Sequence, residues 1–431
     1  MKKWISSIIL CGLFFSTVGL AAADTNSQDA EVTPPNAIIA TYGDASPSLG
    51  VPGVTGFDTK HGGFYVSSKD GFYDSHIYGY IQLQGDMYDG DTFTANNTNN
   101  FHNNLFIPSA RLYDVGKIAG VWGYQFSYDF AGSEIKYADI QYLGFHHVII
   151  TAGQYKPAIT AEVLQDRPAT TFFERSLPAY AFIPDYVIGT QGLIYTNNAT
   201  AAVGMVTPDQ KNQSLGVTTR GGDPIGATTR LSYAPYFDNT DGRGINLGVG
   251  GYYQHTDYQH IVDFSSIPEI KERANSVLVD TGSIANSDAV LVNTAETRAV
   301  YDSFSMGGEY YHTNLTRFGA SDLDFSGAYA SFSYFFTGEH KEYDMKTGTF
   351  HTSHIVHSYG AWEAAARYSY LNLDDQNIVG GLEKDTTFAL YWLPRAQIKT
   401  GITYIFADAT PSSNGLNRHM NIIGLLLEAA F

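Results

Sequence analysis

The sequence predicts an all-β protein: a transmembrane antiparallel β-barrel of about 16 strands, with one loop folded inward as a constriction. The first observation is composition, because only 16% of the 431 residues are charged whereas 14% are aromatic and 43 are Gly. Ordinary domains carry roughly 25% charged residues. The second is a regular alternation of apolar and polar residues in several segments. The third is that no stretch beyond the N-terminal segment reaches the roughly 18 apolar residues of a spanning helix. A closed barrel is the other structure that crosses a bilayer.

The N-terminal residues 1–23 are expected to be a signal peptide. Lys2 and Lys3 precede the apolar run at residues 8–15, and three Ala residues at 21–23 supply the small side chains of a cleavage site. The chain's one Cys lies in this segment, so the mature chain is expected to contain no disulfide. Residues 24–70, rich in Pro, Ala and Gly, are expected to form an extended, partly ordered arm. Residues 71–431 are assigned to the barrel.

The strands are identified by period-two alternation, which is clearest at residues 122–130. The aromatic face there consists of Trp122, Tyr124, Phe126, Tyr128 and Phe130, and the polar face of Gly123, Gln125, Ser127 and Asp129. The same pattern occurs at residues 77–87, 362–370, 395–406 and 423–431. Stretches rich in Asn, Asp, Gly, Ser and Thr, at residues 90–104, 238–244 and 409–417, are expected to be turns and loops.

Alternation alone does not distinguish a membrane barrel from a soluble β-sandwich, whose polar face meets bulk water. Two features favour the barrel. Strands of about ten residues with aromatic side chains toward their ends suit a lipid-facing band with interfacial girdles. The final strand ends in Phe431, which resembles the signal by which outer-membrane barrels are recognised for insertion. About 16 strands account for the chain length, and a barrel of 16 to 18 strands encloses an aqueous channel.

The inward loop is expected within residues 158–185, a segment too irregular for a strand. It lies between a strand ending at Tyr155 and another beginning near Gly189. Its charged residues are candidates for the constriction: Glu162, Asp166, Arg167, Glu174 and Arg175. Charges of both signs suggest a transverse field across the channel. Alternatively, the two arginines pair with Glu162 and Glu174 and fasten the loop to the wall.

Four further basic residues are expected to point into the channel, because they lie on the polar faces of their strands: Arg111, Arg230, Arg367 and Lys399. On the lipid face a charge would cost about 2–4 kcal/mol at mid-membrane. Each could line the channel or simply be matched to an acidic neighbour such as Glu363 or Asp129.

The net charge of −18 excludes nucleic acid as an expected partner, because phosphates repel an acidic surface. It leaves the ion preference open. Acidic residues lining the channel would favour cations, whereas acidic residues in the outer loops need not affect selectivity.

Several short motifs resemble the phosphate-selective porins O and P. They are residues 110–117, 122–131, 135–139, 152–157, 173–178, 279–282, 308–311, 360–363 and 367–369. The resemblance covers roughly residues 70–431. It implies a 16-stranded outer-membrane barrel, usually a homotrimer, whose third loop narrows the channel. It also implies an anion preference that depends on basic pore residues, with a central site formed by two arginines and a loop lysine. Lys156 lies in a matched segment and joins the candidate pore residues. Where the family often carries two further basic residues, this chain has Pro108 and Ser109.

The expected function is that of a bacterial outer-membrane porin, a water-filled channel for passive diffusion of small hydrophilic solutes or ions. A preference for anions or phosphate is one option; a cation-preferring general porin and an outer-membrane adhesin or binding barrel are the alternatives. The expected partners are outer-membrane lipid, small solutes or inorganic anions, and further copies in a homotrimer. No catalytic residue, metal site or cofactor is expected, because the sequence has no nucleophile elbow, metalloprotease motif or phosphate-binding loop.

Overall fold

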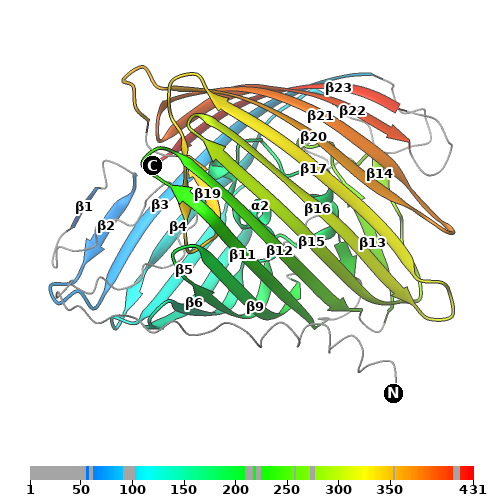
Figure 1. Cartoon of the computed structure of the whole chain (residues 1–431), viewed down its shortest axis with the longest axis horizontal. Coiled ribbons are helices and arrows are strands. Elements are labelled where there is room, and N and C mark those ends of the chain that lie inside the picture. The colour runs from blue at the N-terminus through cyan, green and yellow to red at the C-terminus, as the bar shows by residue number, and fades with distance from the viewer. Residues whose placement is uncertain are drawn as a thin grey trace. The chain divides into compact units, whose positions relative to one another are not determined.

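The computed structural model describes residues 55–57, 62–90, 102–208, 217–219, 225–256, 259–271, 277–352, 355–410 and 418–431. The predicted signal peptide lies outside the described residues. In the part that is described, sixteen antiparallel strands form one closed barrel (Figure 1), because the last strand pairs with the first. The predicted fold class is confirmed. Among the described residues, no helix is long and apolar enough to cross a bilayer.

The barrel strands follow one another around the wall in chain order. They are β3 (Asp74–Gly90), β4 (Asn104–Ile118), β5 (Trp122–Asp129), β6 (Glu134–Phe145), β7 (Val148–Tyr155), β8 (Val187–Tyr195), β9 (Ala199–Pro208), β11 (Gly226–Asp238), β12 (Arg243–His255), β15 (Ser287–Tyr301), β16 (Phe304–Arg317), β17 (Leu323–Phe335), β20 (Ala361–Asp375), β21 (Ile378–Arg395), β22 (Ile398–Thr410) and β23 (Arg418–Ala430). One predicted strand needs correction: residues 395–406 are not one strand, because β21 ends at Arg395 and the chain turns before β22.

Alternation along each strand separates an outer apolar face from an inner polar face. On β5, Trp122 and Phe126 are each 45% exposed on the outside, whereas Gln125, Ser127 and Asp129 are buried on the inside. An exposed aromatic face of this kind would be unfavourable in water but suits contact with lipid. The same alternation places the polar residues of the other strands in the lumen.

The barrel closes where β23 pairs with β3, from Met420 opposite Gly90 to Ala430 opposite Tyr80. Phe431 continues this ladder through backbone hydrogen bonds with Gly79. Beyond that point β2 (Phe64–Ser67) pairs with the first residues of β3, and β1 (Thr55–Phe57) pairs with β2. The described part of the predicted arm therefore contains a small hairpin that extends the sheet.

The two ends of the barrel have different connections. Six of the seven connections at the end that holds the C-terminus are turns of two to four residues. This end is called the turn end, and the other the loop end. Short periplasmic turns and longer extracellular loops are typical of outer-membrane barrels. The exception at the turn end is the connection between β17 and β20, residues 336–360.

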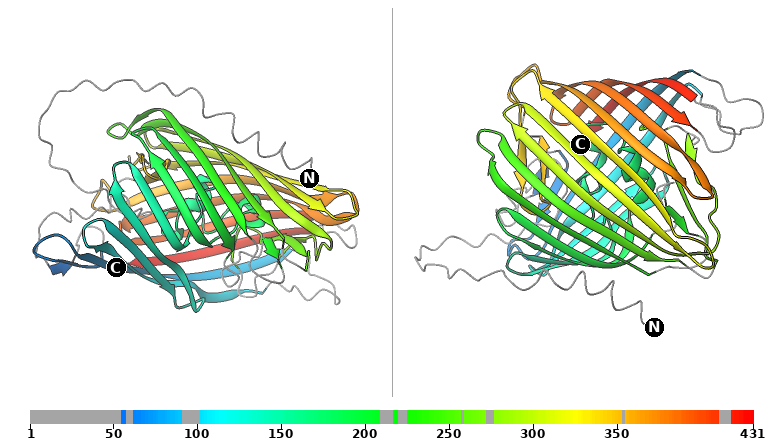
Figure 2. Two further views of the ribbon diagram at one scale, coloured as in Figure 1. Left: turned by 90° about the horizontal axis from the view of Figure 1, so that it is seen from below. Right: turned by 45° about the vertical axis from the view of Figure 1, so that its right-hand side comes forward.

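Three long connections fold into the barrel (Figure 2) and carry short elements of their own. They are L3 (156–186), with α2 (Ala161–Leu164), the 3₁₀ turn η1 (Arg167–Ala169) and α3 (Leu177–Phe182); L5 (256–286), with β13 (Val262–Ser266) and β14 (Val279–Asp280); and T6 (336–360), with β18 (Lys341–Asp344) and β19 (Thr349–Thr352). A further strand, β10 (Val217–Thr219), pairs with β13. L5 covers L3, because Phe264 of β13 packs between Phe182 of α3 and Phe325 of the wall. The sequence predicts one inward loop, so the insertion of L5 and T6 is a finding of the structure.

Candidate pore constriction

L3 begins directly after β7 and returns to the wall at β8, close to the predicted limits of 158–185. Its short helices begin at residues that suit a helix N-terminus. Thr160 caps α2 by accepting a hydrogen bond from the Val163 backbone at 3.3 Å. Pro168 and Pro178 are the second residues of η1 and α3, within the first turn, where a missing N–H is tolerated. The segment is therefore a series of single turns that follow the inside of the barrel.

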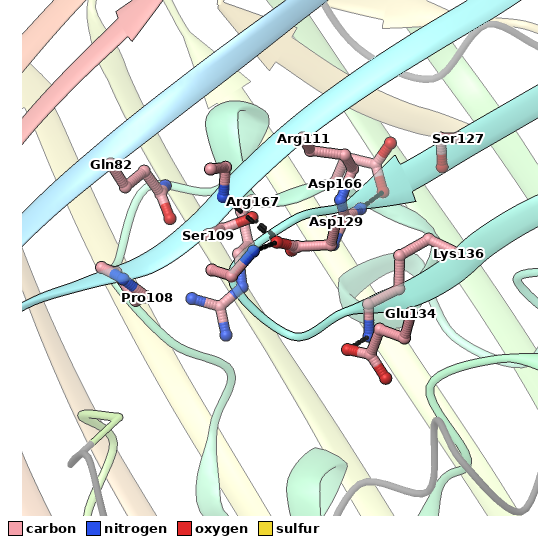
Figure 3. Close-up of polar contacts among 12 residues, drawn as sticks. Gln82, Pro108, Ser109, Arg111, Ser127, Asp129, Glu134, Lys136, Asp166 and Arg167 are labelled. Carbon is pink, nitrogen blue, oxygen red and sulfur yellow. Dashed lines mark hydrogen bonds and ion pairs between the residues drawn. The ribbon is translucent and has the colours of Figure 1, made fainter.

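One side of L3 is fastened to β4 around Arg111 (Figure 3). Its guanidinium lies 3.5 Å from Asp129 of β5 and 3.9 Å from Asp166 of L3, and donates to the Tyr186 hydroxyl at 2.9 Å. Asp166 also pairs with Lys156 at 2.7 Å. The predicted residues Arg111, Lys156 and Asp166 thus form one buried network that links loop and wall.

The two positions that depart from the family pattern lie beside this network. Ser109 donates its hydroxyl to Asp129 at 2.6 Å, so a neutral donor occupies the place where a base was expected. The carbonyl of Pro108 accepts from Lys271 at 3.5 Å, and Lys271 belongs to L5. A basic group therefore reaches this part of the lumen from a loop that sequence analysis did not identify.

The other side of L3 is fastened to β20 by Arg367. This side chain pairs with Glu162 of L3 at 3.3 Å and with Glu269 of L5 at 2.9 Å. It also donates to the backbone carbonyl of Glu174 at 3.0 Å. Because Arg367 contacts both inserted loops, one guanidinium holds L3 and L5 together against the wall.

Two wall carboxylates bind the backbone at the start of α2. Glu296 of β15 accepts from the Ala161 N–H at 2.6 Å, and Glu309 of β16 accepts from the Glu162 N–H at 2.9 Å. Arg230, predicted to face the lumen, pairs with the same Glu296 at 2.6 Å. The backbone can approach this closely because residue 250 is Gly: a Cβ there would lie 2.0 Å from the Ile159 carbonyl oxygen.

The remaining predicted residues make contacts within L3 or at its edge. Arg167 pairs with Glu174 at 2.6 Å, one of the pairings considered from the sequence. Arg175 pairs instead with Asp185 at 2.5 Å. Lys399 of β22 donates to the Thr170 carbonyl at 2.7 Å. Nine of the ten predicted residues therefore lie in or against L3. The tenth, Arg230, is linked to L3 through Glu296.

Burial changes the acidity of groups in L3. It lowers the pKa of Lys156 to about 8, even though Asp166 favours the charged form. Burial and the nearby Glu309 raise the pKa of Glu162, while Arg367 opposes the shift. Burial alone would raise the pKa of Asp185, but Arg175, Lys136 and Lys156 outweigh it and hold that pKa well below its usual range.

T6 approaches L3 from the turn end. The Gln165 amide donates to the Phe350 carbonyl at 3.1 Å, and Lys341 donates to the Thr171 hydroxyl at 2.9 Å. Arg230 donates to the Thr347 carbonyl at 2.6 Å. Between L3, T6 and the wall lies a cavity with about 700 Å³ of space not filled by atoms, part of it open to solvent. Among its lining residues are Glu174, Arg298, Tyr329, Lys341 and Arg367.

Sequence analysis missed several residues that complete the constriction. Glu296 and Arg298 lie two residues apart on β15, so the period-two pattern of that strand could have identified both as inward-facing. Glu269, Lys271 and Lys341 belong to L5 and T6, where no period-two pattern indicates which face is inward. Among the described residues, no group of three or more His, Cys, Asp or Glu side chains is placed to hold a metal ion.

Comparisons with known proteins agree with this architecture. Residues 78–428 match the family described as phosphate-selective porin O and P. Porin O of Pseudomonas aeruginosa is 23% identical over 394 residues, covering 82% of this chain and 88% of that protein. An anion-selective porin from Comamonas acidovorans has a similar fold, with a TM-score of 0.54 at 10% identity over 83% of this chain and all of that one. The trimer form of OmpT of Vibrio cholerae has a TM-score of 0.50 at 9% identity over 83% and 99%. Because the family match extends over most of the sequence, the chain belongs to the phosphate-selective porin O and P family, whose members are outer-membrane channels.

Proposed function

We propose that this channel passes small hydrophilic solutes and ions by passive diffusion through a lumen that L3 narrows. The observation that carries the proposal is the fastening of L3 on two sides, through Arg111 to Asp129 and Asp166 and through Arg367 to Glu162 and Glu269. A loop held on both sides keeps a fixed aperture, which a diffusion channel needs in order to exclude large solutes. The family and fold are those of a channel rather than of an enzyme.

The proposed pore-lining residues are the ten predicted from sequence: Arg111, Lys156, Glu162, Asp166, Arg167, Glu174, Arg175, Arg230, Arg367 and Lys399. Their proposed role is to hold the constriction loop and to set the field that a passing ion experiences. T6 is proposed to narrow the lumen a second time, because it contacts L3 from the turn end.

The proposed setting is the bacterial outer membrane, reached by export with cleavage after residue 23. The exposed apolar outer face supports contact with lipid. A homotrimer is proposed as the assembly, supported by the family resemblance and by the trimer form of the structurally similar OmpT.

Planar bilayer recordings of the refolded full chain test this function. Discrete conductance steps and entry of small sugars into liposomes are expected. Replacing residues 158–185 with a short Gly-Ser linker should raise the conductance and the size limit for solutes, because the aperture is lost. A protein that inserts into bilayers yet conducts nothing would overturn the proposal. An unchanged size limit in the loop variant would show that L3 is not the constriction.

A further inference from the structure

Buried charge in the barrel is strongly asymmetric. Among the described residues, fifteen Asp or Glu residues are buried, compared with seven Lys or Arg. On the strands, such residues occupy the inner face, as the alternation of burial along β20 and β21 shows. The acidic excess of the whole sequence is thus also present inside the barrel.

The seven buried bases each have an acceptor. Six form ion pairs, which are Arg111 with Asp129, Lys117 with Asp74, Lys136 with Glu134, Lys156 with Asp166, Arg230 with Glu296 and Arg367 with Glu269. The seventh, Lys399, donates to the Thr170 carbonyl and lies 4.5 Å from the centre of the Tyr391 ring. A positive charge whose field is cancelled by a neighbouring carboxylate attracts an anion only weakly.

Two buried carboxylates on β21 have no such match. Glu383 and Asp385 are both fully buried, and none of their four oxygen atoms has a hydrogen-bond partner. They lie two residues apart on the inner face, with Thr387 of the same strand next in line. Thr387 donates to Glu269 of L5 at 2.6 Å, and Glu269 is already paired with Arg367. The groups without a partner in this region are therefore acidic.

An ionised carboxylate without a partner is costly to bury, and a bound cation or a proton offsets that cost. Inside a channel with low-dielectric walls, fixed charge of one sign raises the local concentration of counterions, by about tenfold or more. A potassium or sodium ion, or a proton, that reaches these two carboxylates would supply the missing partner.

We propose that this channel passes small inorganic cations in preference to anions, and that Glu383 and Asp385 are the residues that determine this preference. The inference rests on the proposed diffusion function and adds the class of ion.

The test is the ratio of potassium to chloride permeability, measured for the refolded full chain in planar bilayers under a KCl gradient. The wild type should give a ratio above one. The double variant Glu383→Gln with Asp385→Asn keeps the shape of both side chains and should lower the ratio by about twofold or more. The matched control, Asp241→Asn with Asp302→Asn, removes two exposed acidic groups at the turn end and should leave the ratio unchanged.

Each result decides a separate point. A conducting wild type with a ratio below one would overturn the inference while leaving the channel intact. A wild-type ratio above one that the β21 double variant does not lower would show that Glu383 and Asp385 hold protons and do not determine the preference. If the double variant fails to fold, the two single variants and the wild-type ratio still decide the question. Absence of any conductance would count against the proposed function itself.

Discussion

The wall formed by β3–β8 and the wall formed by β15–β23 both hold L3, but they balance charge differently. Among the described residues, the first wall buries four carboxylates and three bases, and the second buries six carboxylates and two bases. On the first wall, the buried bases pair with carboxylates of the same wall. On the second, Arg367 is used by two inserted loops while Glu383 and Asp385 stay without a partner.

The comparison shows that facing the lumen and acting on a solute are different properties. Arg111 faces inward, as alternation predicts, but its charge is shared between Asp129, Asp166 and the Tyr186 hydroxyl. Its contribution is mainly to position L3. On the other wall Glu383 and Asp385 have no hydrogen-bond partner, so the second wall is expected to dominate the ion preference.

Arg367→Met should produce the largest effect, because it leaves Glu162 and Glu269 buried without a cation. Breaking a buried ion pair by removing one partner costs about 3–5 kcal/mol. Urea unfolding in detergent micelles should show a loss of stability in this range. Lys399→Met is the control, since Lys399 donates only to the Thr170 carbonyl among the contacts described. Equal losses for the two variants would contradict the central role of Arg367.

Gly250→Val should displace L3 from the space between the two walls. The new Cβ would lie 2.0 Å from the Ile159 carbonyl oxygen, so the loop must move. Overpacking of this kind costs about 1–3 kcal/mol, and single-channel conductance should change with it. Gly192→Ala is the matched control, because a Cβ there meets nothing within 4 Å. A wild-type conductance in Gly250→Val would show that L3 does not depend on this contact.

Lys156 should make the ion preference depend on pH, since burial lowers its pKa to about 8. Below that pH its positive charge offsets Asp166; above it the charge is lost and the network becomes more negative. Between this pKa and the ordinary Lys value the unfolded chain binds more protons, so stability rises with pH there. The potassium to chloride permeability ratio should therefore rise as pH passes through about 8. Lys156→Arg should abolish the step, and a step that persists in this variant must come from another group.

The smallest effect is expected at the turn end, at the exposed pair of Arg243 and Asp302. The two groups lie 3.2 Å apart, with side chains 39% and 55% exposed. Ion pairs this exposed contribute little to stability, because water and salt screen them. Arg243→Gln should thus leave both urea unfolding and the permeability ratio close to wild type. A large change in either would mean that the turn end contributes more to stability or selectivity than its contacts indicate.

The positions of the strands and their inner faces could be predicted from the sequence, because apolar and polar residues alternate along a strand whose two faces meet lipid and the lumen. β5 and the inward orientation of Arg111 and Arg367 follow from that pattern. L5 and T6 could not be predicted, since their positions depend on contacts with distant residues: Glu269 reaches Arg367, and Lys341 reaches Thr171. The pairing of Arg175 with Asp185 was missed for the same reason, because L3 folds back on itself between them.

The closure between β3 and β23 has a consequence for how the protein is made. Gln82 donates to Glu428 at 2.7 Å across a separation of 346 residues. β3, the first strand of the barrel, can therefore complete its pairing only after β23, the last one, has been synthesised. Pairing over such a distance is slow. Until β23 is in place, β3 presents an unsatisfied backbone edge of the kind that invites mispairing. β2 already covers one end of that edge, which shortens the stretch of β3 that is left unpaired before the barrel closes.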